Sequence, residues 1–208
     1  MTAPLDVRPT DRKRLPPGQI ETRKWPVLHY GMVPRIDLAT WRLSLTGAVE
    51  RPVSLDWAAL MALPQARTLC DIHCVTHWSR FDNIFGGVGV ETVMKLVTLR
   101  AGVSHVLVHA APDYTTNLPL VDFLAPGNLL ALRHNDEDLA PEHGGPIRLL
   151  VPHLYLWKSA KWVTGFEFLT EDAPGFWEQN GYHMRGEPWE EERYGRPDPA
   201  RMRRGPRG

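Results

Sequence analysis

The stretch L-C-D-I-H-C-V-T-H-W-S-R-F-D-N-I-F-G-G-V, residues 69–88, holds the densest group of reactive side chains in this 208-residue sequence. Cys70 and Cys74 are the only cysteines of the chain, which is far from the cysteine density of a disulfide-stapled domain. His73 and His77 flank Cys74, and nearby positive charge stabilises a thiolate. The pattern therefore suits Cys74 to metal ligation or to nucleophilic chemistry.

Three chemical interpretations of this stretch stay open on the residues alone. The spacing C-x2-H-C-x2-H, from Cys70 to His77, offers four zinc donors, but neither a helix nor a strand wraps four donors at this spacing around one ion. Cys74 with His73 or His77 as its base would form a nucleophilic pair, although the chain completes no familiar thiol-hydrolase pattern. Cys70, which has apolar neighbours, is also typical of a buried and inert core cysteine.

Alternation of apolar and polar residues predicts short strands along the whole chain. The predicted strands cover residues 41–47, 69–75, 105–110, 129–133, 147–151 and 162–169. The predicted helices are one capped by Ser54 and stopped by Pro64, one over 90–97, and one of at most two turns over 120–124. The glycines in 86–89 predict a turn. This mixture, without regular strand–helix alternation, indicates an α+β fold with a mixed or mainly antiparallel sheet.

Composition excludes several classes of protein. Lys and Arg together number 24, as do Asp and Glu, so no net charge favours nucleic acid as a partner. No apolar run approaches the roughly 18 residues of a membrane span. The 19 prolines are spread along the chain, which excludes a helical bundle or a coiled coil. What remains is a globular domain long enough to bury its own core.

The chain divides into three parts. Residues 1–24 are polar, charged and proline-containing, which predicts an extended arm without a core of its own. Residues 25–194 form the predicted domain, and 195–208 form a basic tail. Within the domain, the apolar segment 25–34 predicts an ordered irregular structure. No apolar segment follows the basic residues near the N-terminus, so we expect no signal peptide and a cytoplasmic location.

A series of motifs resembles one known family. D-I-H-C-V-T-H-W-S-R at 71–80 resembles the cysteine segment of the sulfite-oxidase-like molybdopterin-dependent oxidoreductases. The likeness is strongest to the single-domain branch related to the catalytic subunit of periplasmic methionine-sulfoxide reductase. Further motifs follow in the family's order: V-L-H-Y-G at 27–31, Y-T-T-N-L-P-L at 114–120, P-E-H-G-G-P-I-R-L-L-V-P at 141–152, L-Y-L-W-K-S-A-K-W-V at 154–163 and F-W-E-Q-N-G-Y-H at 176–183. Together they cover about residues 25–194.

The resemblance implies an α+β molybdopterin-binding domain of the sulfite oxidase type, with mixed sheets and short helices. It implies molybdenum and molybdopterin (a pyranopterin dithiolene) as cofactor, with Cys74 as the metal ligand. A soft thiolate suits such a redox-active metal. The residues matched to cofactor contacts are His29, Thr115, His143, Arg148, Ser159, Ala160 and Lys161, with Thr116 beside them. Arg148 and Lys161 are the cations suited to the pterin phosphate.

The implied activity is transfer of an oxygen atom to or from a small substrate, by S-oxide reduction or by oxidation of a sulfite-like anion. His73, His77 and Arg80 flank Cys74 and are the catalytic candidates for the substrate pocket. No haem, flavin or iron–sulfur motif is evident, so we expect electrons to come from an unidentified partner protein or a small carrier. No dimerisation domain is evident either, so we expect a monomer.

The residues after Cys74 depart from the Gly-Asn-Arg pattern of animal and plant sulfite oxidases, which argues against sulfite as the substrate. Two other functions remain compatible with the sequence. One is a molybdopterin carrier or redox sensor without turnover, and the other is a zinc-stabilised binding module built on residues 70–77.

Overall fold

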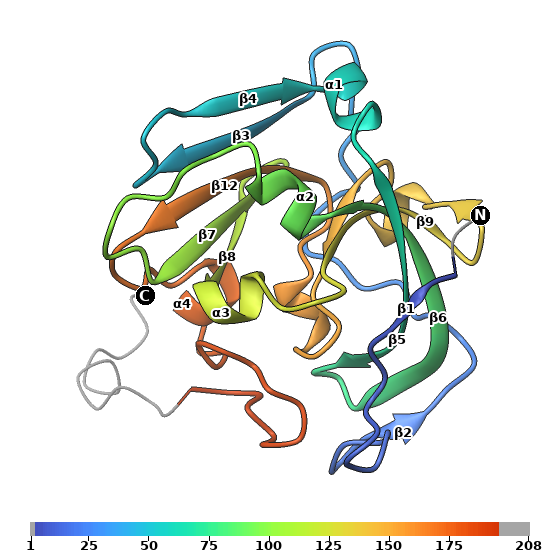
Figure 1. Cartoon of the computed structure of the whole chain (residues 1–208). Coiled ribbons are helices and arrows are strands. Elements are labelled where there is room, and N and C mark those ends of the chain that lie inside the picture. Colours follow the sequence, from blue (N-terminus) through green and yellow to red (C-terminus); the bar gives the residue numbers. More distant parts are fainter. Residues whose placement is uncertain (1–2, 196–208) are drawn as a thin grey trace.

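Two β-sheets and a few short helices build the part of the chain that the computed structural model describes, residues 3–195 (Figure 1). The first sheet has seven strands: β1 (Leu5–Asp6), β5 (Gln65–Cys74), β6 (Trp78–Gly89), β9 (Leu129–His134) and β10 (Glu137–Asp138) in order, with β11 (Arg148–Leu150) on β9 and β2 (Ile20–Glu21) on β6. The second has five, in the order β4 (Val53–Asp56), β3 (Arg42–Gly47), β12 (Val163–Leu169), β7 (His105–Ala110) and β8 (Tyr114–Pro119). Parallel pairs occur in both sheets, and the predicted α+β class with mixed sheets is confirmed.

The helices are short, as the sequence predicts. They are α1 (Trp57–Met61), α2 (Val90–Met94), α3 (Leu120–Phe123) and α4 (Phe176–Gln179), with 3-10 turns η1 (Pro141–His143) and η2 (Leu156–Lys158). Asp56, and not Ser54, caps α1, because its Oδ1 accepts a hydrogen bond from Ala59 N at 2.8 Å. Ser54 lies inside β4 opposite Ser44, away from the start of the helix.

The largest hydrophobic core joins residues of both sheets. Its fully buried members include Leu43, Leu45, Val106, Val108, Phe166 and Phe168 of the second sheet and Leu130 and Leu149 of the first. Every second residue of β3 and β7 faces this core, which is the period of a strand. Burying each such side chain stabilises the fold by about 1.5–3 kcal/mol, so this core fixes how the sheets face each other.

The glycine-rich end of β6 corrects one prediction. Gly86, Gly87 and Gly89 lie within a strand and not in a turn. A Cβ on Gly87 would collide with the carbonyl oxygen of Leu130 on the neighbouring strand β9. The pairing of β6 with β9 shifts register between Gly86 and Gly87, and such a bulge accounts for glycines inside a strand.

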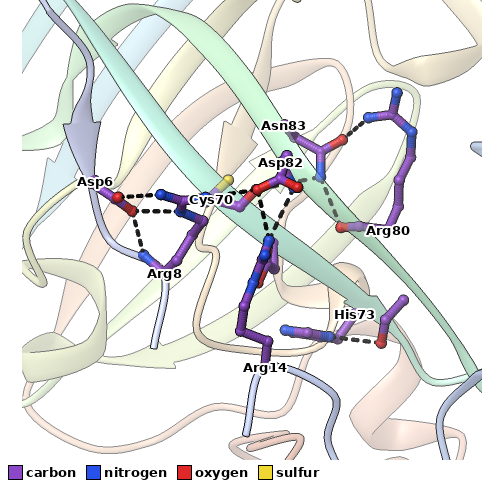
Figure 2. A network of polar contacts seen from close by, with 10 residues as sticks. Asp6, Arg8, Arg14, Cys70, His73, Arg80, Asp82 and Asn83 are labelled. Atoms are coloured by element: carbon purple, nitrogen blue, oxygen red, sulfur yellow. Dashed lines mark hydrogen bonds and ion pairs between the residues drawn. The ribbon is translucent and has the colours of Figure 1, made fainter. Parts of the chain in front are cut away.

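Residues 3–24 are irregular apart from β1 and β2, which join the first sheet. Arg14 donates from Nε and Nη2 to the two carboxylate oxygens of Asp71, at 2.7 and 2.6 Å, and the Asp71 side chain is 1% exposed. Figure 2 shows Arg8 and Arg14 both reaching Asp82. Buried charge therefore ties this arm to the sheet.

The limits of the predicted domain, 25 and 194, stay a prediction. Of the predicted basic tail, residues 196–208 lie outside the described part of the chain. Across residues 3–195, no helix combines the length and the apolar character that crossing a membrane requires.

We predict that Gly87→Ala destabilises the fold while Gly86→Ala does not. The new methyl at 87 has to displace the backbone of β9, and such overpacking costs about 1–3 kcal/mol. At Gly86 the nearest atom to a Cβ is 3.7 Å away, so this variant is a matched control. Urea denaturation measures the free energy of unfolding of each variant. Equal values for the two variants would contradict the close approach of Gly87 to the backbone of β9.

We also predict that Arg14→Met destabilises the fold far more than Arg8→Met. Removing Arg14 leaves the buried Asp71 carboxylate without its cation, which costs about 3 kcal/mol. Arg8 and Asp82 are both partly exposed, with 31% and 57% of their side chains accessible. Their pair is worth about 0–1 kcal/mol. Thermal unfolding of both variants tests this prediction. A similar loss of stability in each variant would show that the arm carries no buried charge.

Candidate active site

A cavity of about 510 Å³ opens beside the end of β5. Its wall comes from five parts of the chain, within residues 25–32, 74–78, 111–114, 148–162 and 176–182. A volume of this size lies within the range of about 300–1,000 Å³ that is typical of ligand and cofactor sites. The predicted site residues that line it are His29, Cys74, Arg148, Ser159, Ala160 and Lys161.

Cys74 is the last residue of β5 and lies at the tip of the β5–β6 hairpin. The N–H of His77 donates to Cys74 O at 3.2 Å and closes the turn. Cys74 Sγ lies 3.1 Å from Thr76 Oγ1, and the residue is 8% exposed. Burial raises the pKa of the thiol, while hydrogen bonding with Thr76 and the charges of Arg193 and Lys161 act in the opposite direction. A thiol placed in this way can serve as a metal ligand at the cavity.

Segments from both ends of the described chain hold the Cys74 turn. Gln19 Nε2 donates to Cys74 O at 3.0 Å, and Arg193 Nη1 donates to Val75 O at 2.7 Å. Gln19 and Arg193 are both buried. Donors fixed inside the protein satisfy these carbonyls and set the position of the turn. Sequence reasoning missed both residues, because they are far from Cys74 in the chain and form no motif with it.

Arg148 is a buried cation whose guanidinium has more N–H donors than its hydrogen bonds use. The residue is 2% exposed. Its Nη1, Nη2 and Nε donate to the carbonyl oxygens of His143, Ser159 and Leu149 at 2.8, 2.7 and 3.4 Å. These bonds leave part of the guanidinium donor set free. Burial lowers the pKa of Arg148 to about 10, so it is still charged at neutral pH.

Lys161 lies next to Arg148, because an isolated antiparallel bridge pairs the two residues. Its Nζ donates to Leu28 O at 2.7 Å and to Glu142 O at 2.6 Å. Burial and, second, the charge of Arg148 lower the pKa of Lys161 to about 7. A bound anion would favour the protonated amine.

Neither cation has a carboxylate partner among the ion pairs of residues 3–195. Lys158, three residues before Lys161, is the contrast: its Nζ lies 2.6 Å from Glu178 Oε1, and both side chains are fully buried. Burying a cation without a counter-charge is costly. The wall at Arg148 and Lys161 is therefore complementary to an anion such as a phosphate.

The loop before Arg148 approaches both cations closely. Gly144 has φ +104°, and a Cβ there would lie 3.0 Å from the Cβ atoms of Arg148 and Lys161. His143 does not form the cavity wall, but its ring stacks on that of Trp25, which does, with centroids 4.1 Å apart. The buried His143 Nδ1 has no hydrogen-bond partner within residues 3–195, so it is available to a ligand at the two cations.

The apolar segment 25–34 forms one side of the cavity. Tyr30 and Met32 are 69% and 88% exposed, although both side chains are large and apolar. They border an open cavity, and Lys161 holds the segment through the carbonyl of Leu28. Trp78 lines the cavity too, and its buried Nε1 has no hydrogen-bond partner in the described part of the chain.

His73 and His77 do not reach the cavity wall. His73 is next to Cys74 on β5, and neighbouring residues of a strand point to opposite faces. Its Nδ1 lies 2.8 Å from Ser79 Oγ, and burial lowers its pKa to about 4. His77 is exposed, and its Nδ1 lies 2.9 Å from Gly18 O.

Arg80 and the two threonines also lie away from the cavity wall. Arg80 hydrogen-bonds with Asn83 on the same strand (Figure 2). Thr115 lies in β8, and the Thr116 hydroxyl donates to Glu178 Oε1 at 3.0 Å. Of the predicted site residues, the structure therefore gathers the thiol and the two cations but leaves these three at a distance from the wall.

The geometry does not support the zinc or the nucleophilic interpretation. Within residues 3–195, no three His, Cys, Asp or Glu side chains are grouped to hold a metal ion. Cys70 belongs to a different core cluster from Cys74, and both are free thiols. The hydrogen bond of Cys74 Sγ is with Thr76 Oγ1, while His73 and His77 bond to Ser79 and Gly18, so the bonds of residues 3–195 pair neither histidine with the thiol.

Known proteins of similar sequence point to one family. The family described as "Oxidoreductase molybdopterin binding domain" matches residues 30–177. The uncharacterized oxidoreductase YuiH of Bacillus subtilis is 48% identical over 182 residues, which span 87% of this chain and 92% of that protein. A putative protein-methionine-sulfoxide reductase subunit, YedZ1 of Azospira oryzae, is 30% identical over 174 residues, 82% of this chain and 66% of that protein. A sulfite oxidase of Arabidopsis thaliana is 24% identical over 192 residues, 75% of this chain and 49% of that protein.

A solved structure shares the fold. The sulfane dehydrogenase SoxCD from Paracoccus pantotrophus superposes with a TM-score of 0.61 at 19% identity, covering 67% of this chain and 40% of that chain. At this identity the likeness concerns the fold alone. It agrees with the two mixed sheets described above.

We predict that a thiol reagent labels Cys74 faster than Cys70 in the folded, cofactor-free protein. Cys74 borders the cavity, whereas Cys70 is fully buried, and burial raises the pKa of its thiol far above the usual range. Mass spectrometry of the labelled peptides at short times measures both rates. Cys74→Ser should abolish the fast labelling and Cys70→Ser should preserve it; the reverse result would place the wrong cysteine at the cavity.

Proposed function

The chain belongs to the oxidoreductase molybdopterin binding domain family, and from this membership we propose that it transfers an oxygen atom to or from a small substrate at a molybdenum centre held by Cys74. It is a molybdopterin-dependent oxidoreductase of the sulfite oxidase family, with molybdenum and molybdopterin as its cofactor. The oxygen-atom chemistry and the roles of individual residues are the proposal.

One observation carries this proposal: the Cys74 thiol, the buried Arg148 and the partly buried Lys161 border the same cavity, and neither cation has a carboxylate partner within residues 3–195. A thiolate suits molybdenum, and a neighbouring pair of cations suits the phosphate of the pterin. Arg148 and Lys161 would hold that phosphate, and the backbone of Ser159 and Ala160 would lie beside it. His143 Nδ1 and Trp78 Nε1 are unused buried polar atoms that would meet the pterin. His29, on the segment that borders the cavity, would contact its exposed side.

When bound, the cofactor supplies a metal that exchanges two electrons together with an oxygen atom. Cys74 binds as the thiolate, and Lys161 and Arg193 favour that charge. Reduction of a sulfoxide consumes two electrons and two protons and releases a sulfide and water. Oxidation of sulfite consumes water and releases sulfate, two electrons and two protons. We propose a separate one-electron carrier, protein or small molecule, as the electron partner.

We assign His73, His77 and Arg80 to the support of the β5–β6 hairpin. His73 bonds across the hairpin to Ser79, and His77 anchors the arm at Gly18. These contacts hold the backbone of the hairpin in place and thereby position Cys74. Thr115 and Thr116 we likewise assign to support of β8 and α4, because the Thr116 hydroxyl is engaged with Glu178.

Metal content and turnover test the proposed function. Protein made with cofactor synthesis intact should contain about one molybdenum atom per chain, held by a soft thiolate donor. It should reduce a sulfoxide with reduced viologen or oxidise sulfite with ferricyanide. Cys74→Ser should fold but lose turnover, whereas Cys70→Ser should keep most of it. Stoichiometric zinc without molybdenum, or equal loss in both variants, would overturn the proposal.

We predict that Arg148→Ala and Lys161→Ala each lower molybdenum and pterin content while turnover per bound molybdenum changes little. A charge-assisted contact to a buried anion is worth about 1.5–3 kcal/mol, or about ten- to a hundredfold in affinity. The control is Arg133→Ala, because the Arg133 side chain is 63% exposed and pairs at the surface with Asp138. Full cofactor content with lost turnover would instead assign Arg148 or Lys161 to the substrate.

A further inference from the structure

The cavity wall has a second half that the cofactor contacts do not use, and it is aromatic. Tyr30, Phe176, Trp177 and Tyr182 all line the cavity. Their rings follow one another in contact, with centroids 4.8 Å apart for Tyr30–Phe176, 5.0 Å for Phe176–Trp177 and 4.9 Å for Trp177–Tyr182. We refer to these four residues as the aromatic wall.

The aromatic wall extends from the surface to the metal-binding thiol. Trp177 and Tyr182 pack against the buried cluster that contains Cys74 and Trp157, and the Trp157 and Tyr182 rings are 5.1 Å apart. At the other end Tyr30 is 69% exposed, so part of its ring is free to be covered. A substrate whose oxygen atom approaches the metal beside Cys74 would lay its remaining atoms along these rings.

The charges of the wall select against an anion once the cofactor is bound. Among Asp, Glu, Lys and Arg, the described residues that line the cavity are Arg148, Lys161 and Asp113. The two cations are engaged by the pterin phosphate in the proposed function. The remaining charge is the carboxylate of Asp113, which repels a second anion.

From these observations we infer that the substrate is a neutral organic oxide carrying an aromatic group, and that its ring packs on the aromatic wall. The inference rests on the proposed oxygen transfer and adds the class of substrate. Aromatic rings attract one another in offset-stacked and edge-to-face arrangements, which the members of the wall already adopt. In the reaction the S–O or N–O bond breaks, two electrons arrive from the reduced one-electron carrier, and two protons complete the water that leaves.

Steady-state kinetics of the molybdenum-loaded enzyme test the inference, with reduced viologen as the electron donor. We expect kcat/KM for methyl phenyl sulfoxide to exceed that for dimethyl sulfoxide by at least about tenfold, because the second lacks a ring. Tyr30→Ala should raise KM for methyl phenyl sulfoxide about two- to tenfold and change that for dimethyl sulfoxide little. Tyr30→Phe keeps the ring and is the matched control, which should behave like the unaltered enzyme.

Equilibrium binding provides a readout that does not depend on turnover. Methyl phenyl sulfone has the same ring without a reducible S-oxide, and dimethyl sulfone is its ringless counterpart. Calorimetric titration should show tighter binding of methyl phenyl sulfone, weakened in Tyr30→Ala and retained in Tyr30→Phe. Molybdenum content, measured alongside, should be the same in all three proteins.

The outcomes separate this inference from the proposed function. Equal kcat/KM for the two sulfoxides, or turnover of sulfite with no turnover of either sulfoxide, would overturn the aromatic substrate and leave oxygen transfer standing. Tyr30-dependent binding of the sulfone without turnover of any of these compounds would support the aromatic wall and overturn oxygen transfer. Absence of both binding and turnover would overturn both.

Discussion

The site depends on two cations beside a cavity, the buried Arg148 and the partly buried Lys161, which no carboxylate of residues 3–195 neutralises. Backbone carbonyl oxygens hold each of them in place, and these carbonyls belong to three separate parts of the chain, at residues 28, 142–143 and 159. Such an arrangement is unfavourable unless an anion completes it. The same contacts draw together β11, the loop at Gly144 and the segment 25–34, so one electrostatic requirement organises most of the cavity wall.

Two lysines of one short motif illustrate how the surroundings decide a role. Lys158 and Lys161 lie in K-S-A-K, and both are largely buried. Lys158 Nζ meets Glu178 and Asn117 and is neutralised inside the protein. Lys161 Nζ donates to two carbonyl oxygens, those of Leu28 and Glu142, and the residue borders the cavity. The first therefore stabilises the packing of α4 on β8, while the second presents charge to a ligand.

Half of the twelve strands in the described residues could be predicted, namely β3, β5, β7, β9, β11 and β12, because the pattern of apolar residues within a strand is a local property. β3 and β7 alternate cleanly over the main core, whereas the pairing of β12 with β7 shifts register between Val163 and Gly165; all three strands lie within a few residues of their predicted limits. The first part of β6 lies in none of the predicted strands, since its bulged pairing interrupts the alternation of buried residues. β1 and β2 are two-residue strands that exist only because the first sheet offers them an edge. No local pattern in the sequence of the arm predicts these two strands.

The sequence by itself determined the family, the α+β class and the chemistry of the groups that matter: one thiol and two cations in motifs of fixed order. The tertiary structure decided which of the neighbouring candidates reach the cavity. Cys74 faces it and His73 does not, because adjacent residues of a strand point to opposite faces. It also brought Gln19 and Arg193 to the Cys74 turn and the aromatic residues 176–182 to its side. These contacts join residues far apart in the chain, and only the packing of the whole fold brings them within reach of one another.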